Sequence, residues 1–221
     1  MGSPVALQLA QTGIGRLIIA DDDRVERSNL HRQILHSTLR IGLPKVHSAS
    51  QTLLGIGPNT QVNAIYQRVN QNNLSSILLE CDLAIDGSDN FTSRHQLNRA
   101  CLERGIPYVS GAVLGFEGQV ASFLHGLDPS APCYACLNPN TEENCILDPL
   151  IPTCATAGVL GPIAGLIGIL QARMAVALLT GTAVQTLLGY LWLINPLDNL
   201  FMRVEIPKNP RCPVCGPSGS G

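Results

Sequence analysis

The sequence predicts an α/β fold with a mainly parallel sheet, and two observations support it. Strand-like and helix-like segments alternate between Val5 and Ser110. Such alternation is typical of parallel sheets, because two parallel strands need a crossover connection, usually a helix. Polar residues also follow directly after two apolar strands, at Asp21 and Asp86. Ligands of open α/β sheets bind at these strand ends, so we expect a Rossmann-like nucleotide-binding domain with flanking helices.

The first half of the chain gives each expected element a local signal. The first helix ends at Gly13 and Gly15, which suit a left-handed cap. The strand from Gln61 alternates apolar and polar residues, and Gly105 with Pro107 separates the last helix from the next strand. Helices are expected over 5–11, 45–54, 72–79 and 92–104, and strands over 17–20, 61–69, 83–85 and 108–110.

The second half is less regular. We expect glycine-marked turns between 111 and 124, a strand over 119–123, and strands near 190–194 and 202–206. The region 128–152 has no clear periodicity and is expected to be a functional loop. A long apolar segment follows, but Gln171 and Arg173 interrupt it before the roughly 20 residues that span a bilayer. It is therefore expected to be a buried helix, with a second helical segment near Val184 and a disordered tail over 216–221.

Composition excludes several classes of function. The chain has 221 residues, which suits one domain over 1–221, and its formal net charge is −2 with 14% charged residues. Non-specific nucleic-acid binding depends on a basic surface, so nucleic acid is not an expected partner. The first residues lack the basic and apolar regions of a signal peptide. We therefore expect a cytoplasmic protein without a membrane segment.

Four of the eight cysteines form two pairs with two-residue spacing, Cys133 with Cys136 and Cys212 with Cys215. This spacing lets both thiolates of a pair bind one tetrahedral Zn²⁺, so the pattern predicts a structural zinc site that joins the tail to the middle of the chain. A redox dithiol and unrelated free thiols are the alternatives. Cys81 and Cys101 lie in apolar surroundings and are expected to be core residues, while Cys145 is unassigned.

Several polar residues occupy expected strand ends and helix starts, where a nucleotide, its phosphates and Mg²⁺ would need them. They are Asp21, Asn29, Arg32, Gln33, Lys45 and Asp89. Each alone is also explained as a solvated capping residue. As a set they favour a nucleotide site, in which Asp21 binds the ribose, Arg32 the phosphates and Asp89 the Mg²⁺.

The whole chain resembles the ubiquitin-activating-type adenylyltransferases, and within them the bacterial sulfur-carrier activators of thiamine and molybdenum cofactor synthesis. The resemblance rests on segments in the same order: 21–33, Gly42-Leu43-Pro44-Lys45-Val46, Asp86-Gly87-Ser88-Asp89-Asn90 with Arg94, 154–162 and both cysteine pairs. It implies ATP-dependent adenylation of the C-terminal glycine of a small ubiquitin-like sulfur carrier. It also implies a homodimer, catalytic Mg²⁺, structural Zn²⁺ and a cysteine desulfurase or other sulfur donor.

The resemblance also implies residue roles. Asp21 would bind the ribose and Asp89 would organise Mg²⁺. The residues that would surround the phosphates are Asn29, Arg32, Gln33 and Lys45, and Asp23 and Asn90 would complete the nucleotide site. Arg32, Lys45, Asp89 and Cys154 would be the catalytic residues. Cys154 lies where some relatives bond covalently to the carrier or transfer sulfur; a buried small hydrophobe is the other interpretation.

One departure from the family pattern matters. Family members carry a first strand and a glycine-rich turn before Leu-Gly-Ser-Pro, and this chain begins Met1-Gly2-Ser3-Pro4. We therefore expect a sheet without a central strand and an ATP pocket that lacks one wall. The alternative function is a truncated, non-catalytic module that binds the carrier or another partner. An NAD-dependent oxidoreductase is disfavoured, because its fingerprint needs the glycine-rich turn.

Overall fold

The computed structural model describes residues 1–139, 158–182, 187 and 189–217. Its first sheet pairs β1 (Arg16–Ala20) in parallel with β2 (Gln61–Ile65). The second sheet has five strands in the order β3-β4-β5-β6-β7. These strands are β3 (Ala84–Ile85), β4 (Tyr108–Leu114), β5 (Glu117–Phe123), β6 (Tyr190–Asn195) and β7 (Leu200–Glu205). No described strand joins the two sheets.

The helices follow the predicted positions closely. They are α1 (Gly2–Gln11), α2 (Lys45–Ile56), α3 (Gln71–Ile77), α4 (Phe91–Arg104), α5 (Tyr134–Leu137) and α7 (Gly161–Leu179). Short 3₁₀ turns cover Arg27–Asn29, Thr38–Arg40 and Pro196–Asp198. Glycines with positive φ follow α1 and α4, Gly13 at 80° and Gly105 at 67°. Local signals therefore set these helix ends.

The parallel pairing that the alternation predicts is found for β1–β2 and β3–β4, and the second sheet then continues as an antiparallel meander from β4 to β7. Gly111 lies inside β4 instead of in a turn, which corrects one expectation from the sequence. The β4–β5 turn is at Gly115, whose φ is 57°. Gly111 is a glycine for a packing reason, because an added Cβ would lie 2.6 Å from the side-chain amide carbon of Gln171.

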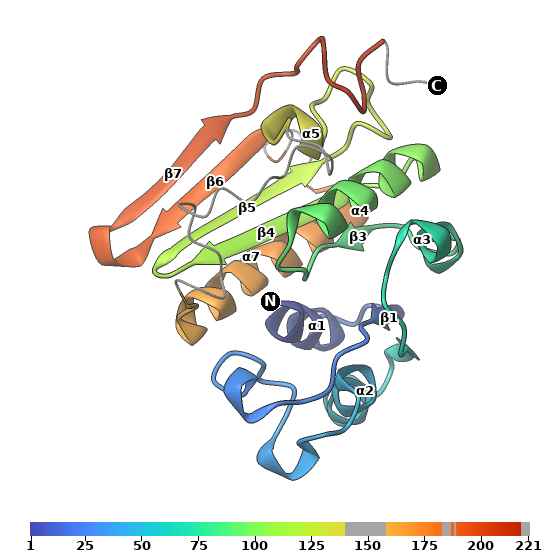
Figure 1. Cartoon of the computed structure of the whole chain (residues 1–221), viewed down its shortest axis with the longest axis vertical. Helices are drawn as coiled ribbons and strands as arrows, with labels where there is room; N and C mark the ends of the chain where they lie inside the picture. Colours follow the sequence, from blue (N-terminus) through green and yellow to red (C-terminus); the bar gives the residue numbers. More distant parts are fainter. Residues whose placement is uncertain (140–157, 183–186, 188, 218–221) are drawn as a thin grey trace.

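α7 is the helix that the sequence predicts, and it is buried over part of its surface. It is long and apolar enough to cross a membrane by length and composition. In this fold it packs against α1 on one side and against β4 and β5 on the other (Figure 1). At the contact with α1, Gly168 lets the helices approach so closely that an added Cβ would lie 2.5 Å from the Pro4 ring. The second helical segment expected near Val184 falls on residues outside the described ranges.

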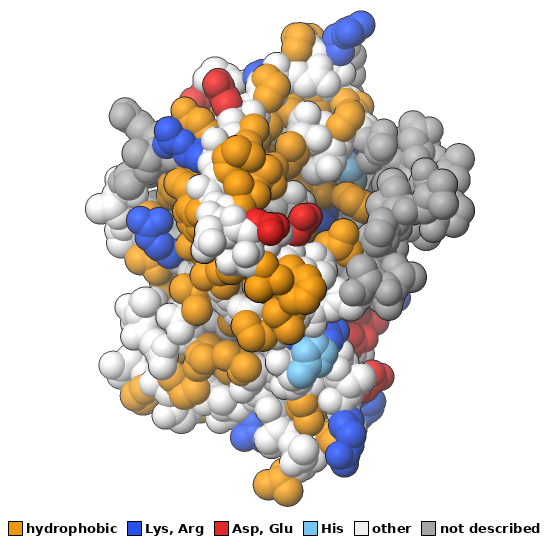
Figure 2. Space-filling view, turned by 90° about the vertical axis from the view of Figure 1, so that its left-hand side faces the viewer, with side chains coloured by type: hydrophobic (Ala, Val, Ile, Leu, Met, Phe, Trp, Pro, Cys, Tyr) orange, Lys and Arg blue, Asp and Glu red, His pale blue; other side chains and the backbone are white. Residues whose placement is uncertain are grey.

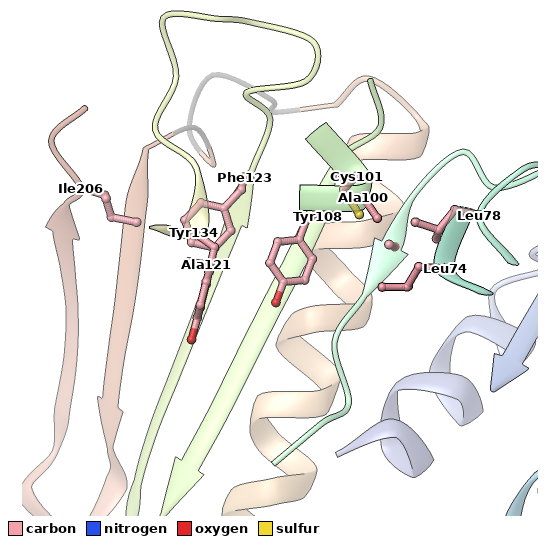
Figure 3. Close-up of a cluster of buried hydrophobic side chains, with 10 residues drawn as sticks. Leu74, Leu78, Ala100, Cys101, Tyr108, Ala121, Phe123, Tyr134 and Ile206 are labelled. Atoms are coloured by element: carbon pink, nitrogen blue, oxygen red, sulfur yellow. The ribbon is translucent and has the colours of Figure 1, made fainter. Parts of the chain in front are cut away.

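The opposite face of the second sheet carries another apolar cluster, which packs against α3, α4 and α5 (Figure 3). Tyr108 of β4 and Phe123 of β5 stack there, with ring centroids 5.7 Å apart. Tyr134 meets Phe123 edge to face from α5, and its backbone N–H donates to Asn98 at 2.9 Å. α5 lies in the region expected to be an irregular loop, and the burial of Tyr134 explains why this turn is ordered.

β7 forms an edge of the second sheet, and all its residues are exposed. Leu200, Phe201, Met202 and Val204 are between 37% and 58% exposed. The face of the molecule on this side shows many hydrophobic side chains (Figure 2). An exposed apolar edge strand of this kind is a typical site for contact with another protein.

Candidate functional site

The end of β1 and the start of α2 form the first part of the site. β1 delivers Asp21, whose partly buried carboxylate accepts a hydrogen bond from the Asp23 amide at 2.8 Å. Burial raises the pKa of Asp21, although that hydrogen bond and the Lys45 charge oppose the rise. Lys45 is only 9% exposed, and its Nζ lies 2.6 Å from Asp23 Oδ2. The structure therefore brings two predicted acids and the predicted lysine into one cluster.

The segment after β1 contributes Arg32 and two amide side chains, those of Asn29 and Gln33. Arg32 Nη2 donates to Asn29 Oδ1 at 2.8 Å, which holds the guanidinium over its own turn. Gln33 Oε1 is buried and has no hydrogen-bond partner among the described residues. Buried polar atoms in proteins are nearly always paired. This acceptor therefore fits a site whose ligand brings a hydrogen-bond donor.

The turn after β3, residues 86–89, forms the third part. Asp86 is 2% exposed, and its Oδ1 accepts bonds from the Ser88 amide at 2.8 Å and the Ser88 hydroxyl at 2.6 Å. Its Oδ2 pairs with Arg94 Nε at 3.0 Å, and Arg94 Nη2 donates to Ser88 O at 3.0 Å. Asp89 follows at the exposed end of this turn. Asn90 caps α4, because its side-chain oxygen accepts from the Ser93 amide at 2.8 Å.

Charges from all three parts act on the N-terminus. Burial lowers the pKa of the Met1 amino group, Arg32 and Lys45 lower it further, and Asp86 and Asp89 oppose the change. The first residues of the chain lie against the 86–89 turn, because a Cβ added to Gly87 would lie 3.3 Å from the Gly2 nitrogen. Cations and carboxylates that belong to three separate segments therefore lie near the N-terminus. This set of charges suits a polyphosphate and its divalent cation.

The four paired cysteines form a second cluster. They come from two parts of the chain, α5 with the residue before it and the C-terminal segment, which lie near each other in Figure 1. Cys133 Sγ lies 3.7 Å from Cys212 Sγ, and Cys136 Sγ lies 3.5 Å from Cys215 Sγ. All four sulfurs lie within 4.8 Å of one another. Four sulfurs at 2.3 Å from a tetrahedral Zn²⁺ are separated by about 3.8 Å. The donor set and its spacing therefore fit zinc.

Lys208 lies beside this cluster and donates from Nζ to Cys215 Sγ at 3.0 Å. Burial acts to raise the pKa of Cys215, but the Lys208 hydrogen bond and those from the other cysteines lower it below its ordinary value. Burial and Cys212 raise the pKa of Cys133 instead. A nearby cation reduces the repulsion among thiolates that bind one metal.

The other cysteines divide into two groups. Cys101 is 2% exposed in the apolar cluster of Figure 3, and burial raises its pKa to about 12, so it is the core residue that was expected. Cys81 is half-buried beside the same cluster, where burial raises its pKa. Cys145 and the predicted catalytic residue Cys154 lie outside the described residues.

The structure adds two residues that the sequence did not assign to the site, Asp86 and Gln171. Gln171 Nε2 donates to the Asp86 carbonyl oxygen at 2.9 Å from the middle of α7. Asp86 follows a strand as Asp21 does, and that position was an available signal. Gln171 is a polar residue in an apolar helix, and such a residue is a second signal in the sequence.

Comparison with solved structures shows the fold. Escherichia coli MccB in complex with MccA-N7isoASN gives a TM-score of 0.82 at 21% identity, over 97% of this chain and 64% of that chain. The structure of PaaA gives 0.76 at 23% identity, over 94% and 61%. This chain therefore spans somewhat less than two thirds of these proteins. The similarity confirms a Rossmann-like α/β fold.

Comparison by sequence shows the family. A Haloferax volcanii protein named SAMP-activating enzyme E1 is 40% identical over 219 residues, covering 99% of this chain and 78% of that protein. The sulfur carrier protein adenylyltransferase of Thermus thermophilus is 40% identical over 220 residues, covering 98% and 79%. The molybdopterin-synthase adenylyltransferase of Escherichia coli is 36% identical over 216 residues, covering 98% and 83%. The sequence pattern of the ThiF family matches residues 1–214, and the chain therefore belongs to the ThiF family.

Proposed function

We propose that this chain adenylates the C-terminal carboxylate of a small ubiquitin-like sulfur-carrier protein with ATP. The observation that carries the proposal is the cluster of Asp21, Asp23 and the buried Lys45 at the end of β1, with Arg32 in the segment that follows and Asp89 in the turn after β3. Relatives that share 36–40% identity over nearly the whole chain are named adenylyltransferases of sulfur carriers or of molybdopterin synthase. The exposed apolar edge at β7 favours a protein substrate over a small molecule.

In the proposed reaction the carboxylate oxygen attacks the α-phosphorus of ATP, the bond to the β,γ-phosphate breaks, and pyrophosphate leaves. Negative charge grows on the phosphate oxygens during this attack. The guanidinium of Arg32 and the ammonium of Lys45 would stabilise that charge, and Asp21 would hold the ribose. Mg²⁺, bound through Asp89 and phosphate oxygens, would add further positive charge. The adenylation step would then depend on positioning and electrostatics, without a covalent enzyme intermediate.

A pyrophosphate–ATP exchange assay tests the proposal. Full-length protein, its ubiquitin-like carrier candidates and Mg²⁺ are mixed with labelled pyrophosphate, and label is expected to enter ATP only when a carrier with an intact C-terminal glycine is present. Carrier without its last glycine is the matched control. Carrier binding without any exchange would instead support the alternative, a non-catalytic binding module.

Arg32 provides the first variant to test in that assay. Arg32→Met is expected to lower the exchange rate by about 10²–10³-fold, the usual effect of removing one charge-stabilising donor from an active site. Its described bonds are the exposed contact to His31 and the one to Asn29, so the melting temperature should stay close to that of the wild type. Arg32→Lys should be intermediate, because lysine keeps the charge but loses the fork of donors.

Arg27 supplies the control for this variant. It is an exposed arginine in the same segment, at the start of a 3₁₀ turn. Arg27→Met removes the same charge at an exposed position that has no predicted role in the site. If both variants lost exchange activity equally, the effect would be a general one of charge and the role of Arg32 would be refuted.

We further propose that the four clustered cysteines bind one structural Zn²⁺. The sulfur–sulfur distances of 3.5 and 3.7 Å are those that a tetrahedral zinc site needs. With four thiolates as ligands, such a site keeps no position for a substrate. Its role would be to hold the C-terminal segment, which follows β7, against α5.

A further inference from the structure

We infer that Gln171 is a positioning residue, which holds the 86–89 turn so that Asp89 faces the phosphates. The inference deepens the proposed function, because it concerns the cation-binding side of the same site. The amide of Gln171 reaches this turn from the middle of α7, eighty-five residues away in sequence. Gln171 is fully buried, with no solvent-accessible surface.

The contact is directed at the backbone of the turn. Gln171 Nε2 donates to the carbonyl oxygen of Asp86 at 2.9 Å, and Asp86 is the residue that follows β3. The side chain of the same Asp86 accepts both donors of Ser88, and Arg94 binds the Ser88 carbonyl. Three elements therefore fix the backbone that carries Asp89: the strand end, α4 and α7. Of these contacts, only the one from Gln171 joins the turn to α7.

The surroundings of Gln171 are built to admit its amide. Gly111 of β4 lies against it, and a Cβ at this position would come within 2.6–2.9 Å of the amide carbon, nitrogen and oxygen of Gln171. Any other residue at 111 would displace the amide. The glycine inside β4, where glycine is otherwise unfavourable, therefore makes room for this one contact.

Packing alone does not explain a glutamine at this position. Its Oε1 atom is buried without a hydrogen-bond partner among the described residues. An unpaired buried acceptor is destabilising, and methionine or leucine would fill a similar volume without it. What glutamine adds, and an apolar residue would not, is the donor that meets Asp86.

α7 also contacts the segment after β1, which carries Arg32. At its first residue, Gly161, an added Cβ would lie 2.2 Å from the His31 carbonyl oxygen, and His31 Nε2 lies 3.2 Å from the Val159 carbonyl oxygen. Ten residues of α-helix, about 15 Å, separate Gly161 from Gln171. One rigid helix therefore contacts the segment of Arg32 at its start and the turn of Asp89 at its middle. It sets the distance between the two.

The test compares Gln171→Met with Ile167→Val. The first removes the amide and keeps the volume. The second removes one methylene from a fully buried α7 residue one turn away, which packs against Gly118 of β5. In pyrophosphate exchange, Gln171→Met should need about 10- to 100-fold more Mg²⁺ for half its maximal rate, the usual cost of losing an outer-shell contact. At saturating Mg²⁺ its rate should recover to that of Ile167→Val.

A second readout does not depend on activity. Hydrogen exchange of the Ser88 amide, which donates to Asp86, should become faster in Gln171→Met than in Ile167→Val. Equal Mg²⁺ requirements in the two variants, or an unchanged Ser88 amide, would overturn the positioning role. If the wild type itself shows no exchange with any carrier, the proposed function fails, while the Ser88 measurement still decides whether Gln171 holds the turn.

Discussion

Replacing Cys212 by serine is expected to lower the free energy of unfolding by more than about 4 kcal/mol, the range typical of losing a structural metal. For a chain of this size that corresponds to a fall in melting temperature of roughly 8–16 °C or more. Thermal unfolding followed by circular dichroism measures the fall. Zinc content should drop from one ion per chain to none in the same variant.

The reason lies in what the cluster joins. Cys133 and Cys212 are 1% exposed and share an apolar cluster with Ala135 next to α5. The segment that follows β7 reaches α5 through these sulfurs. Without the metal, four thiols would crowd within 4.8 Å with only weak attraction between them. Chelation of zinc from the wild type should therefore reproduce the effect of the substitution.

Cys81→Ser is the matched control. Cys81 is a half-buried cysteine outside the cluster, and its thiol donates to the Ile77 carbonyl at 3.4 Å, a bond that serine can keep. Zinc content should stay at one ion per chain, with little change in melting temperature. Disulfide bonds among the four clustered cysteines in metal-free native protein would contradict the zinc site and favour the redox dithiol.

Replacing Arg94 by methionine is expected to cost about 3–5 kcal/mol of unfolding free energy, because it leaves a buried carboxylate without its partner. Arg94 is 6% exposed and Asp86 is 2% exposed, and their ion pair measures 3.0 Å. The lost side chain also removes the bond to the Ser88 carbonyl. Urea unfolding at neutral pH measures the loss.

The loss should depend on pH in a definite direction. Burial already raises the pKa of Asp86 above the ordinary 3.8, although the Arg94 charge opposes the rise. Without Arg94 the pKa rises further, so the folded state binds a proton more tightly than the unfolded state. A raised aspartate pKa makes stability fall as pH rises. The loss of unfolding free energy in Arg94→Met should therefore be small near pH 3.8, the ordinary pKa of an aspartate. It should grow with pH and be complete above the raised pKa of Asp86.

Two further variants isolate the ion pair. Arg99→Met removes an exposed arginine of the same helix and should cost less than about 0.5 kcal/mol. Asp86→Asn added to Arg94→Met should restore part of the stability, because asparagine keeps the acceptor for Ser88 and carries no charge. A deficit that stays the same at all pH values would show that lost packing, not the unpaired carboxylate, causes it.

The sequence by itself determined the features whose signals are local. Alternation of strands and helices gave the α/β class and most helix bounds within a few residues, because periodicity reports which side of each segment is buried. Gly13 and Gly105 marked helix ends, since only glycine takes their positive φ at no cost. Asp21 and Asp89 were predicted as site residues because they come after strands, and the cluster of four cysteines was predicted from their spacing.

The tertiary structure alone decided how distant residues meet. The antiparallel course of β5 to β7 is set by pairing between strands, which the pattern within one strand does not encode. The ion pair of Asp86 with Arg94 and the bond from Gln171 join residues whose local patterns are independent of each other. Gly111 resembles a turn glycine in sequence and is a packing glycine in the fold. Such contacts depend on how whole elements pack, and packing is decided only when all of them are in place.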